Sequence, residues 1–353
     1  MFHPLRVTAV ERLTDDSVAV TLAVPSELRT AYRYDPGQHI VLRRTGEDGT
    51  ELRRTYSLCA PASEAPEELR IGVRRVEGGE FSTYALKELA VGDTVEVLPP
   101  SGRFVLEPRP GRYAAIVGGS GITPVLSIAA TLLEREPEAR FHLLRSDRSA
   151  ASTMFLEEVA DLKDRHPDRF HLVSALSREE QQSGLPTGRL DEERLAGLLP
   201  ALLPVTDVDG WYLCGPLGLV EGATRALRGL GVERNRVHQE IFHAEEPAAG
   251  AAAPAVRTPA PGSATVTATL DGRSGSWPVA DGESVLETVL RNRADAPYAC
   301  KGGVCGTCRV RLLSGEVRMD RNYALEPEEV DAGYVLACQS HPVTAAVEVD
   351  FDS

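Results

Sequence analysis

Short runs in which apolar and polar residues alternate characterise residues 1–108. Val18–Leu22, His39–Leu42 and Thr94–Val97 each have the two-residue period of a half-buried strand, and Gly and Pro turns separate them. Closely spaced short strands of this kind are typical of antiparallel sheets that close on themselves. The first part of the chain is therefore predicted to be an antiparallel β-barrel.

The pattern changes near the sequence EPRPG, and residues 109–245 alternate strand-like and helix-like segments. Buried strands are predicted at Tyr113–Val117, Phe141–Leu144, His171–Val173 and Gly210–Leu213, with amphipathic helices between them. Strands separated by helices pair in parallel because each crossover needs a helix's length of chain. This region predicts an α/β domain with a doubly wound parallel sheet.

Residues 246–262 are rich in Ala and Pro and lack apolar periodicity, so they are predicted to be a linker. Residues 263–353 then combine predicted strands at Ala264–Leu270 and Ala345–Asp350 with a helix at Val285–Asn292 and a loop that carries cysteines. A mixed α+β domain is expected here, which makes the chain a three-domain protein.

Composition and charge narrow the functional classes. The formal net charge of −14 would repel a nucleic-acid backbone, so nucleic acid is not an expected partner. Ala114–Leu133 is uncharged throughout, but Gly118–Gly121 and Pro124 interrupt it, which favours strand, loop and helix over a membrane span. The N-terminus shows no secretory signal, so we expect a cytoplasmic protein with reduced thiols and no membrane partner.

Four of the six cysteines have the spacing of plant-type [2Fe-2S] ligands. Four residues separate Cys300 from Cys305, two separate Cys305 from Cys308, and 29 lie between Cys308 and Cys338. Structural zinc is the alternative, but zinc ribbons usually present two short cysteine pairs, whereas three cysteines share one loop here. Glycines in this loop would let backbone N–H groups approach the cluster sulfurs.

The barrel region contains two segments that could hold a flavin. Arg54-Thr55-Tyr56-Ser57 offers a cation for a pyrophosphate, an aromatic ring for the flavin and a hydroxyl near its N5 atom. Gly79-Glu80-Phe81-Ser82-Thr83 follows at a predicted helix start, where N–H groups bind phosphate. Taken singly, Arg54 fits a surface ion pair, and Tyr56 and Phe81 fit barrel core. His39 and Cys59 are read as ordinary core or surface residues.

The second region contains a candidate nicotinamide site. Gly118–Pro124 follows the first predicted strand and opens a helix, where a dinucleotide pyrophosphate would meet the positive helix end. Cys214-Gly215-Pro216 ends another strand and could lie beside a nicotinamide ring, although a lone cysteine is more often buried core. Arg148 and Ser149 favour the 2′-phosphate of NADPH, whereas Asp147 could bind the ribose hydroxyls of NADH.

These motifs together resemble ferredoxin–NADP reductase-like proteins that carry a C-terminal plant-type ferredoxin. The resemblance implies an FAD-binding barrel, an NAD(P)-binding domain and a β-grasp ferredoxin domain, with Ser57 and Cys214 at the catalytic position and Glu240 helping to orient the flavin ring. The residues implied for FAD are Arg54, Thr55, Tyr56, Ser57, Val73, Gly79, Phe81, Ser82, Thr83 and Phe242. Those implied for NAD(P) are Gly119, Ser120, Gly121, Thr123, Pro124, Arg148, Ser149, Cys214, Gly215 and Pro216.

Three segments give a narrower resemblance, to the reductase subunits of phenylacetyl-CoA epoxidases: Ser149–Phe155, Asn322–Pro327 and Gly333–Leu336. That resemblance implies that NAD(P)H gives hydride to FAD, which passes single electrons through the cluster to a di-iron oxygenase. The reductase component of a Rieske-type oxygenase, such as 3-ketosteroid 9α-hydroxylase, is the alternative within the same class. A passive electron carrier or docking protein is the alternative from another class.

Overall fold

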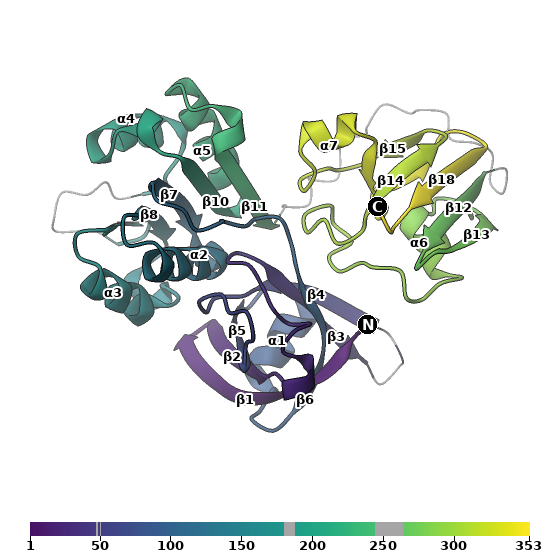
Figure 1. Ribbon diagram of the computed structural model, residues 1–353, viewed down its shortest axis with the longest axis horizontal. Helices are drawn as coiled ribbons and strands as arrows, with labels where there is room; N and C mark the ends of the chain where they lie inside the picture. The colour runs from purple at the N-terminus through teal and green to yellow at the C-terminus, as the bar shows by residue number, and fades with distance from the viewer. Residues whose placement is uncertain (47–48, 50, 180–187, 244–263) are drawn as a thin grey trace. The chain divides into compact units, whose positions relative to one another are not determined.

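The computed structural model describes the chain except residues 47–48, 50, 180–187 and 244–263. Its contacts divide the chain into two compact units, Met1–His243 and Ala244–Ser353, each of which is considered by itself (Figure 1). The predicted linker at 246–262 lies outside the described residues. The predicted domain boundaries at 108, 245 and 262 remain predictions.

The first sheet of unit 1 is the antiparallel barrel expected from residues 1–108. Its strands follow the order β4-β3-β6-β1-β2-β5, and every pairing between them is antiparallel. Leu58, directly after β4, bridges to Ile71 in β5, so the two outer strands of the sheet meet and close it. The elements are β1 His3–Thr14, β2 Ser17–Ala23, β3 His39–Thr45, β4 Glu51–Ser57, β5 Glu68–Arg74, α1 Glu80–Lys87 and β6 Thr94–Ser101.

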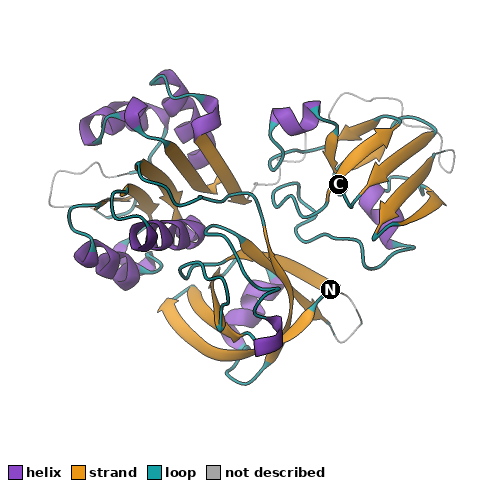
Figure 2. Cartoon of the chain, in the orientation of Figure 1, coloured by secondary structure: helices purple, strands orange, loops and turns teal. Residues whose placement is uncertain are grey.

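The second sheet of unit 1 is parallel throughout, with the order β11-β10-β7-β8-β9, which confirms the doubly wound prediction. Helices lie on both faces of this sheet (Figure 2). Its strands are β7 Arg112–Gly118, β8 Arg140–Asp147, β9 Phe170–Leu176, β10 Gly210–Pro216 and β11 Val237–His243. Its helices are α2 Ile122–Arg135, α3 Leu156–Arg165, α4 Glu192–Leu202 and α5 Leu217–Gly229.

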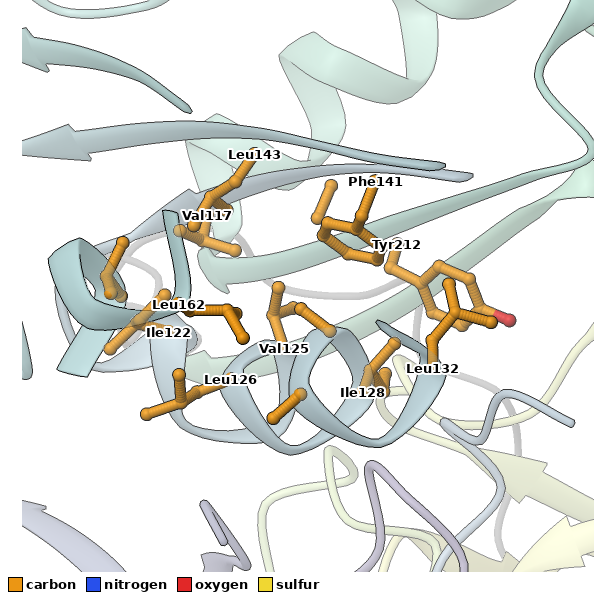
Figure 3. Packing of buried hydrophobic residues seen from close by; sticks show 14 of the residues in the cluster. Val117, Ile122, Val125, Leu126, Ile128, Leu132, Phe141, Leu143, Leu162 and Tyr212 are labelled. Carbon is orange, nitrogen blue, oxygen red and sulfur yellow. The ribbon is translucent and has the colours of Figure 1, made fainter. Parts of the chain in front are cut away.

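Helix α2 explains why the uncharged run beginning at Ala114 is not a membrane span. Residues 122–133 of this helix are all buried, and Val125, Ile128 and Leu132 face the sheet residues Phe141 and Tyr212 (Figure 3). Burial on all sides is what requires an apolar composition around the whole helix. No helix in the described part of the chain is long and apolar enough to cross a bilayer.

Unit 2 has a mixed five-stranded sheet with the order β13-β12-β18-β14-β16, in which β12 and β18 pair in parallel and their other neighbours are antiparallel. A short helix is held by a capping box, in which Ser284 and Glu287 each bond the other's backbone N–H. The elements are β12 Thr265–Leu270, β13 Arg273–Pro278, α6 Val285–Leu290, β14 Arg309–Ser314, β15 Val317–Met319, α7 Pro327–Asp331, β16 Tyr334–Leu336, β17 Ser340–Pro342 and β18 Ala346–Asp350.

Candidate functional site

The segment Arg54–Ser57 forms the end of β4, so alternate side chains point in opposite directions. Arg54 is exposed, and its Nη1 donates to the Arg53 carbonyl at 2.7 Å. Tyr56 and Thr55 are partly exposed, and the Tyr56 ring lies 5.4 Å from that of Phe81. An exposed guanidinium close to an aromatic surface and a hydroxyl has the chemistry that a flavin pyrophosphate and ring require.

The residues predicted around the start of α1 have a structural role in the present conformation. The Ser82 hydroxyl accepts from the Val76 N–H at 3.0 Å and donates to the Gly79 carbonyl at 3.2 Å, and the Thr83 hydroxyl donates to the same carbonyl at 2.7 Å. Val73 and Phe81 are fully buried in the barrel core. Their side chains therefore stabilise the barrel, and their contact with FAD remains a prediction.

The glycine loop after β7 is interlocked with the end of β10. Gly119 has φ of +54°, a left-handed conformation that favours glycine, and a Cβ at Gly121 would lie 2.2 Å from the Cys214 carbonyl oxygen. A Cβ at Gly215, which has φ of +146°, would lie 2.9 Å from the Gly118 nitrogen. The strand end predicted to bind the dinucleotide pyrophosphate and the strand end predicted to lie beside the nicotinamide are thus brought together. The Thr123 hydroxyl donates to the Ser120 carbonyl at 3.0 Å and fixes the loop at the start of α2.

Side chains from both sheets of unit 1 meet at Glu240 in β11. Its Oε2 accepts from Ser57 Oγ at 3.4 Å and lies 3.9 Å from Cys214 Sγ, while its Oε1 lies 3.8 Å from His39 Nδ1. Cys214 is fully buried, and burial, followed by the neighbouring Glu240, raises its thiol pKa well above the ordinary value. The thiol is therefore neutral. Phe242, two residues along β11, is partly buried against the α/β core.

His39 was not predicted as part of this group. No spacing in the sequence connects it with Glu240, because the contact depends on β3 and β11 approaching each other in the folded chain. Arg74 was missed for the same reason: it leaves β5 of the barrel and donates through Nη2 to the Ser152 carbonyl at 2.7 Å. A Cβ at Gly119 would lie 3.0 Å from Arg74 Nη1, so this cation also borders the glycine loop.

In the candidate ribose-binding segment at the end of β8, the two charged side chains lie in different environments. Arg148 is exposed, whereas Asp147 is buried and its Oδ2 accepts from Arg145 Nε at 2.8 Å. Ser149 caps the following short helix by exchanging hydrogen bonds with Ser152. An acid that is buried in an ion pair does not face a ribose, so the structure favours the interpretation of this segment in which Arg148 is the available charged group.

The four cysteines of unit 2 lie in two pairs, three of them in the loop Cys300–Cys308 and the fourth, Cys338, after β16. Cys300 interacts with Cys305, and Cys308 interacts with Cys338. Hydrogen bonds from the Cys305 thiol and from nearby backbone N–H groups lower the pKa of Cys300 to about 5. Lys301 has φ of +53°, which turns the chain inside the loop so that the Gly302 N–H donates to Cys300 Sγ at 3.3 Å.

This donor set fits a two-iron cluster better than a single ion. In the described residues, no three His, Cys, Asp or Glu side chains converge on one metal position. A [2Fe-2S] cluster instead needs two thiolates for each of two irons. The two cysteine pairs match that requirement, and N–H donors such as Gly302 and Gln339, whose amide lies 3.7 Å from Cys338 Sγ, suit anionic sulfurs.

A closed antiparallel barrel, a doubly wound sheet with a glycine loop, and a mixed sheet with paired cysteines define a flavin- and iron–sulfur-dependent electron-transfer reductase. Models of three families match the chain in this order: an oxidoreductase FAD-binding domain at 4–106, an oxidoreductase NAD-binding domain at 115–225, and a 2Fe-2S iron–sulfur cluster binding domain at 268–343. FAD, NAD(P)H and [2Fe-2S] are therefore the cofactors of this chain, as the motifs predicted.

Whole-chain relatives have the same architecture. The E component of the 1,2-phenylacetyl-CoA epoxidase from Escherichia coli is 44% identical over 100% of this chain and 98% of its own length. The ferredoxin reductase component of 3-ketosteroid-9-alpha-monooxygenase from Rhodococcus rhodochrous is 34% identical over 98% of this chain and 96% of its own. A solved structure of phthalate dioxygenase reductase covers 99% of this chain and 98% of its own, with a TM-score of 0.62 and 26% identity. The chain belongs to the family of NAD(P)H-dependent reductase components that deliver electrons to oxygenase partners.

Proposed function

We propose that this chain is the reductase of a phenylacetyl-CoA epoxidase, taking electrons from NADPH and delivering them to a di-iron oxygenase. The observation that carries the proposal is the 44% identity, over essentially both full lengths, with the Escherichia coli epoxidase component, against 34% for a ketosteroid monooxygenase reductase. The segments around Ser149 and Asn322 support the same choice.

Bound FAD would accept a hydride and release its electrons singly, and the cluster would take them one at a time. Within the chain, Arg54 would bind the FAD pyrophosphate and Tyr56 would lie against the ring system, because both are at least partly exposed on β4. Ser57 and Cys214 would flank the site of hydride transfer, with Glu240 between them. Phe242 would approach the same site from the end of β11.

The NADPH pyrophosphate would bind at the loop Gly119–Gly121, where α2 begins and its N–H groups are oriented outward. Arg148 would contact the ribose 2′-phosphate, since its side chain is exposed whereas Asp147 is held by Arg145. Replacing Arg148 with Ala should lower kcat/KM for NADPH about tenfold or more while changing that for NADH less than about twofold. Equal losses with both nucleotides would contradict the NADPH assignment.

Cys300 and Cys305 would ligate one iron, and Cys308 and Cys338 the other, following the thiol pairs of the loop. The unit that carries them has 14 acidic and 8 basic residues from Ser263 onward, so an oxygenase with a basic docking surface is expected. Electron transfer to that oxygenase should weaken between low and high salt. Turnover that is insensitive to salt would count against this docking model.

Anaerobic titration with NADPH and NADH in the presence of a purified oxygenase tests the whole proposal. Flavin and cluster absorbance should bleach with NADPH, and adding di-iron epoxidase with oxygen should restore both. Re-oxidation by a Rieske oxygenase instead would establish the alternative partner. Absorbance that neither nucleotide bleaches would favour a passive carrier. A cytoplasmic location, where thiolate ligands persist in reduced form, is part of the same proposal.

A further inference from the structure

His39 is a buried imidazole that lies next to the group of side chains around Glu240. It is 4% exposed and opens β3, where it pairs directly with Ser57 of β4. Its Nε2 is buried and has no hydrogen-bond partner within the described residues. The ring is thus enclosed by protein beside Ser57.

The Glu240 carboxylate faces the imidazole. His39 Nδ1 lies 3.8 Å from Oε1, and the other carboxylate oxygen, Oε2, is directed at Ser57 and Cys214. The carboxylate is therefore held on two sides: His39 on one, and the serine and thiol on the other. With side-chain exposures of 5% for His39 and 15% for Glu240, the contact is largely screened from water.

The backbone at Gly102 packs closely against the Nδ1 side of the ring. Gly102 has φ of +117°, and a Cβ there would lie 2.8 Å from His39 Nδ1, so the glycine leaves only enough room for the imidazole. The Gln38 amide donates to the Gly102 carbonyl at 3.4 Å, which ties the residue before His39 to the same turn. Two elements of the barrel thus fix the nitrogen opposite Glu240.

We propose that His39 is a positioning residue that holds Glu240 between Ser57 and Cys214. It acts through the 3.8 Å contact between Nδ1 and Oε1, which restricts the rotation of the carboxylate. Because Ser57 and Cys214 are the residues assigned to the hydride-transfer position, this inference rests on the proposed function. The consequence is that the rate of hydride transfer should depend on His39 through its effect on Glu240.

Two variants separate positioning from packing. Asparagine at this position, His39→Asn, keeps a nitrogen donor close to the place of Nδ1, whereas His39→Leu keeps the apolar volume and removes the donor. We expect His39→Leu to slow flavin reduction by NADPH about tenfold in stopped flow, with less than about a twofold change in KM for NADPH. His39→Asn should recover most of the rate. His3→Gln, which alters another barrel histidine bonded to Tyr32, is the matched control and should leave the rate unchanged.

Two further measurements test the contact between His39 and Glu240 directly. The ¹⁵N signal of His39 Nδ1 in the full-length holoprotein should shift in Glu240→Gln and stay in place in His3→Gln. The double variant His39→Leu/Glu240→Gln should be no slower than Glu240→Gln alone, since residues that act through one contact are not additive. Additive losses, an unmoved Nδ1 signal, or a wild-type rate in His39→Leu would each overturn the proposal. If the wild type does not accept electrons from NADPH, the proposed function is overturned. The ¹⁵N measurement needs no turnover, so it would still test the contact between His39 and Glu240.

Discussion

The buried ion pair between Arg145 and Asp147 allows a quantitative prediction about stability. The Arg145 and Asp147 side chains are 1% and 2% exposed, and the pair is joined at 2.8 Å, with Arg145 Nη2 also donating to the Met154 carbonyl at 3.0 Å. Replacing Asp147 with Asn keeps the shape and removes the charge, which leaves a buried guanidinium uncompensated. Breaking such a pair from one side costs about 3–5 kcal/mol.

For a unit of this size, each kcal/mol lowers Tm by about 2–4 °C, so Asp147→Asn should melt about 6–20 °C below the wild type by calorimetry. The matched control is Glu192→Gln, because Glu192 pairs with Arg225 at 2.7 Å but both side chains are about half exposed. That control should melt like the wild type. The apolar replacement Arg145→Met/Asp147→Leu should recover most of the loss, since removing both charges leaves neither unpaired.

The reasoning would be refuted by an Asp147→Asn variant that melts with the control, or by a double variant less stable than the single one. The Asp147→Asn variant also tests whether the chain prefers NADPH or NADH. If Asp147 bound the ribose hydroxyls of NADH, its replacement would raise the NADPH to NADH ratio of kcat/KM. A ratio within about twofold of the wild type is expected, because the carboxylate is already engaged by Arg145.

Three other predictions follow from local geometry. Gly121→Ala would drive a Cβ into the Cys214 carbonyl, so it should raise KM for NADPH about tenfold in steady-state kinetics. The FAD content, measured by absorbance, should stay constant. An unchanged KM would contradict the close packing of the two loops. Cys338→Ser should abolish the cluster absorbance and transfer to the oxygenase but keep ferricyanide reduction by NADPH, and an intact cluster spectrum would remove Cys338 from the ligand set. Burial, with His171 and neighbouring arginines, lowers the pKa of His142 to about 4. As the pH falls, the unfolded chain therefore takes up this proton before the folded chain does. The free energy of unfolding should decrease by on the order of 1 kcal/mol between about pH 6.5 and 4, a small value because the group is half exposed. Urea unfolding of the wild type and His142→Gln checks this, since the variant should lack that part of the pH dependence.

The features that could be predicted from sequence are those encoded by local spacing. Cys300, Cys305 and Cys308 share one loop, and the glycines of Gly118–Gly121 directly follow a buried strand, so neighbouring residues carry the signal. Strand β11 escaped prediction because its sequence VHQEIFH has neither strict alternation nor an apolar run. The sheet stabilises this segment by pairing it with β10, which is a tertiary effect.

Contacts between elements that are distant in sequence could not be predicted either, because they depend on the tertiary fold. His39 and Glu240 are separated by 201 positions, so only the approach of the barrel to the parallel sheet brings them together. Asp147 and Arg148 are adjacent in sequence and were read as alternatives, one for the ribose of NADH and the other for the 2′-phosphate of NADPH, but Asp147 is buried and Arg148 is exposed. Sequence proximity in a strand is a poor guide to which side chains act together.

Strand β11 also constrains how the protein can be re-engineered. It ends unit 1 at His243, and Glu240 lies only three residues before that end. Suppose that a chimera is made by joining a foreign electron-carrier module upstream of β11. The chimera would lose strand β11 and with it Glu240, the carboxylate opposite Ser57. Module exchange should therefore be made after residue 243, where the splice would preserve the whole nucleotide-handling half of the chain.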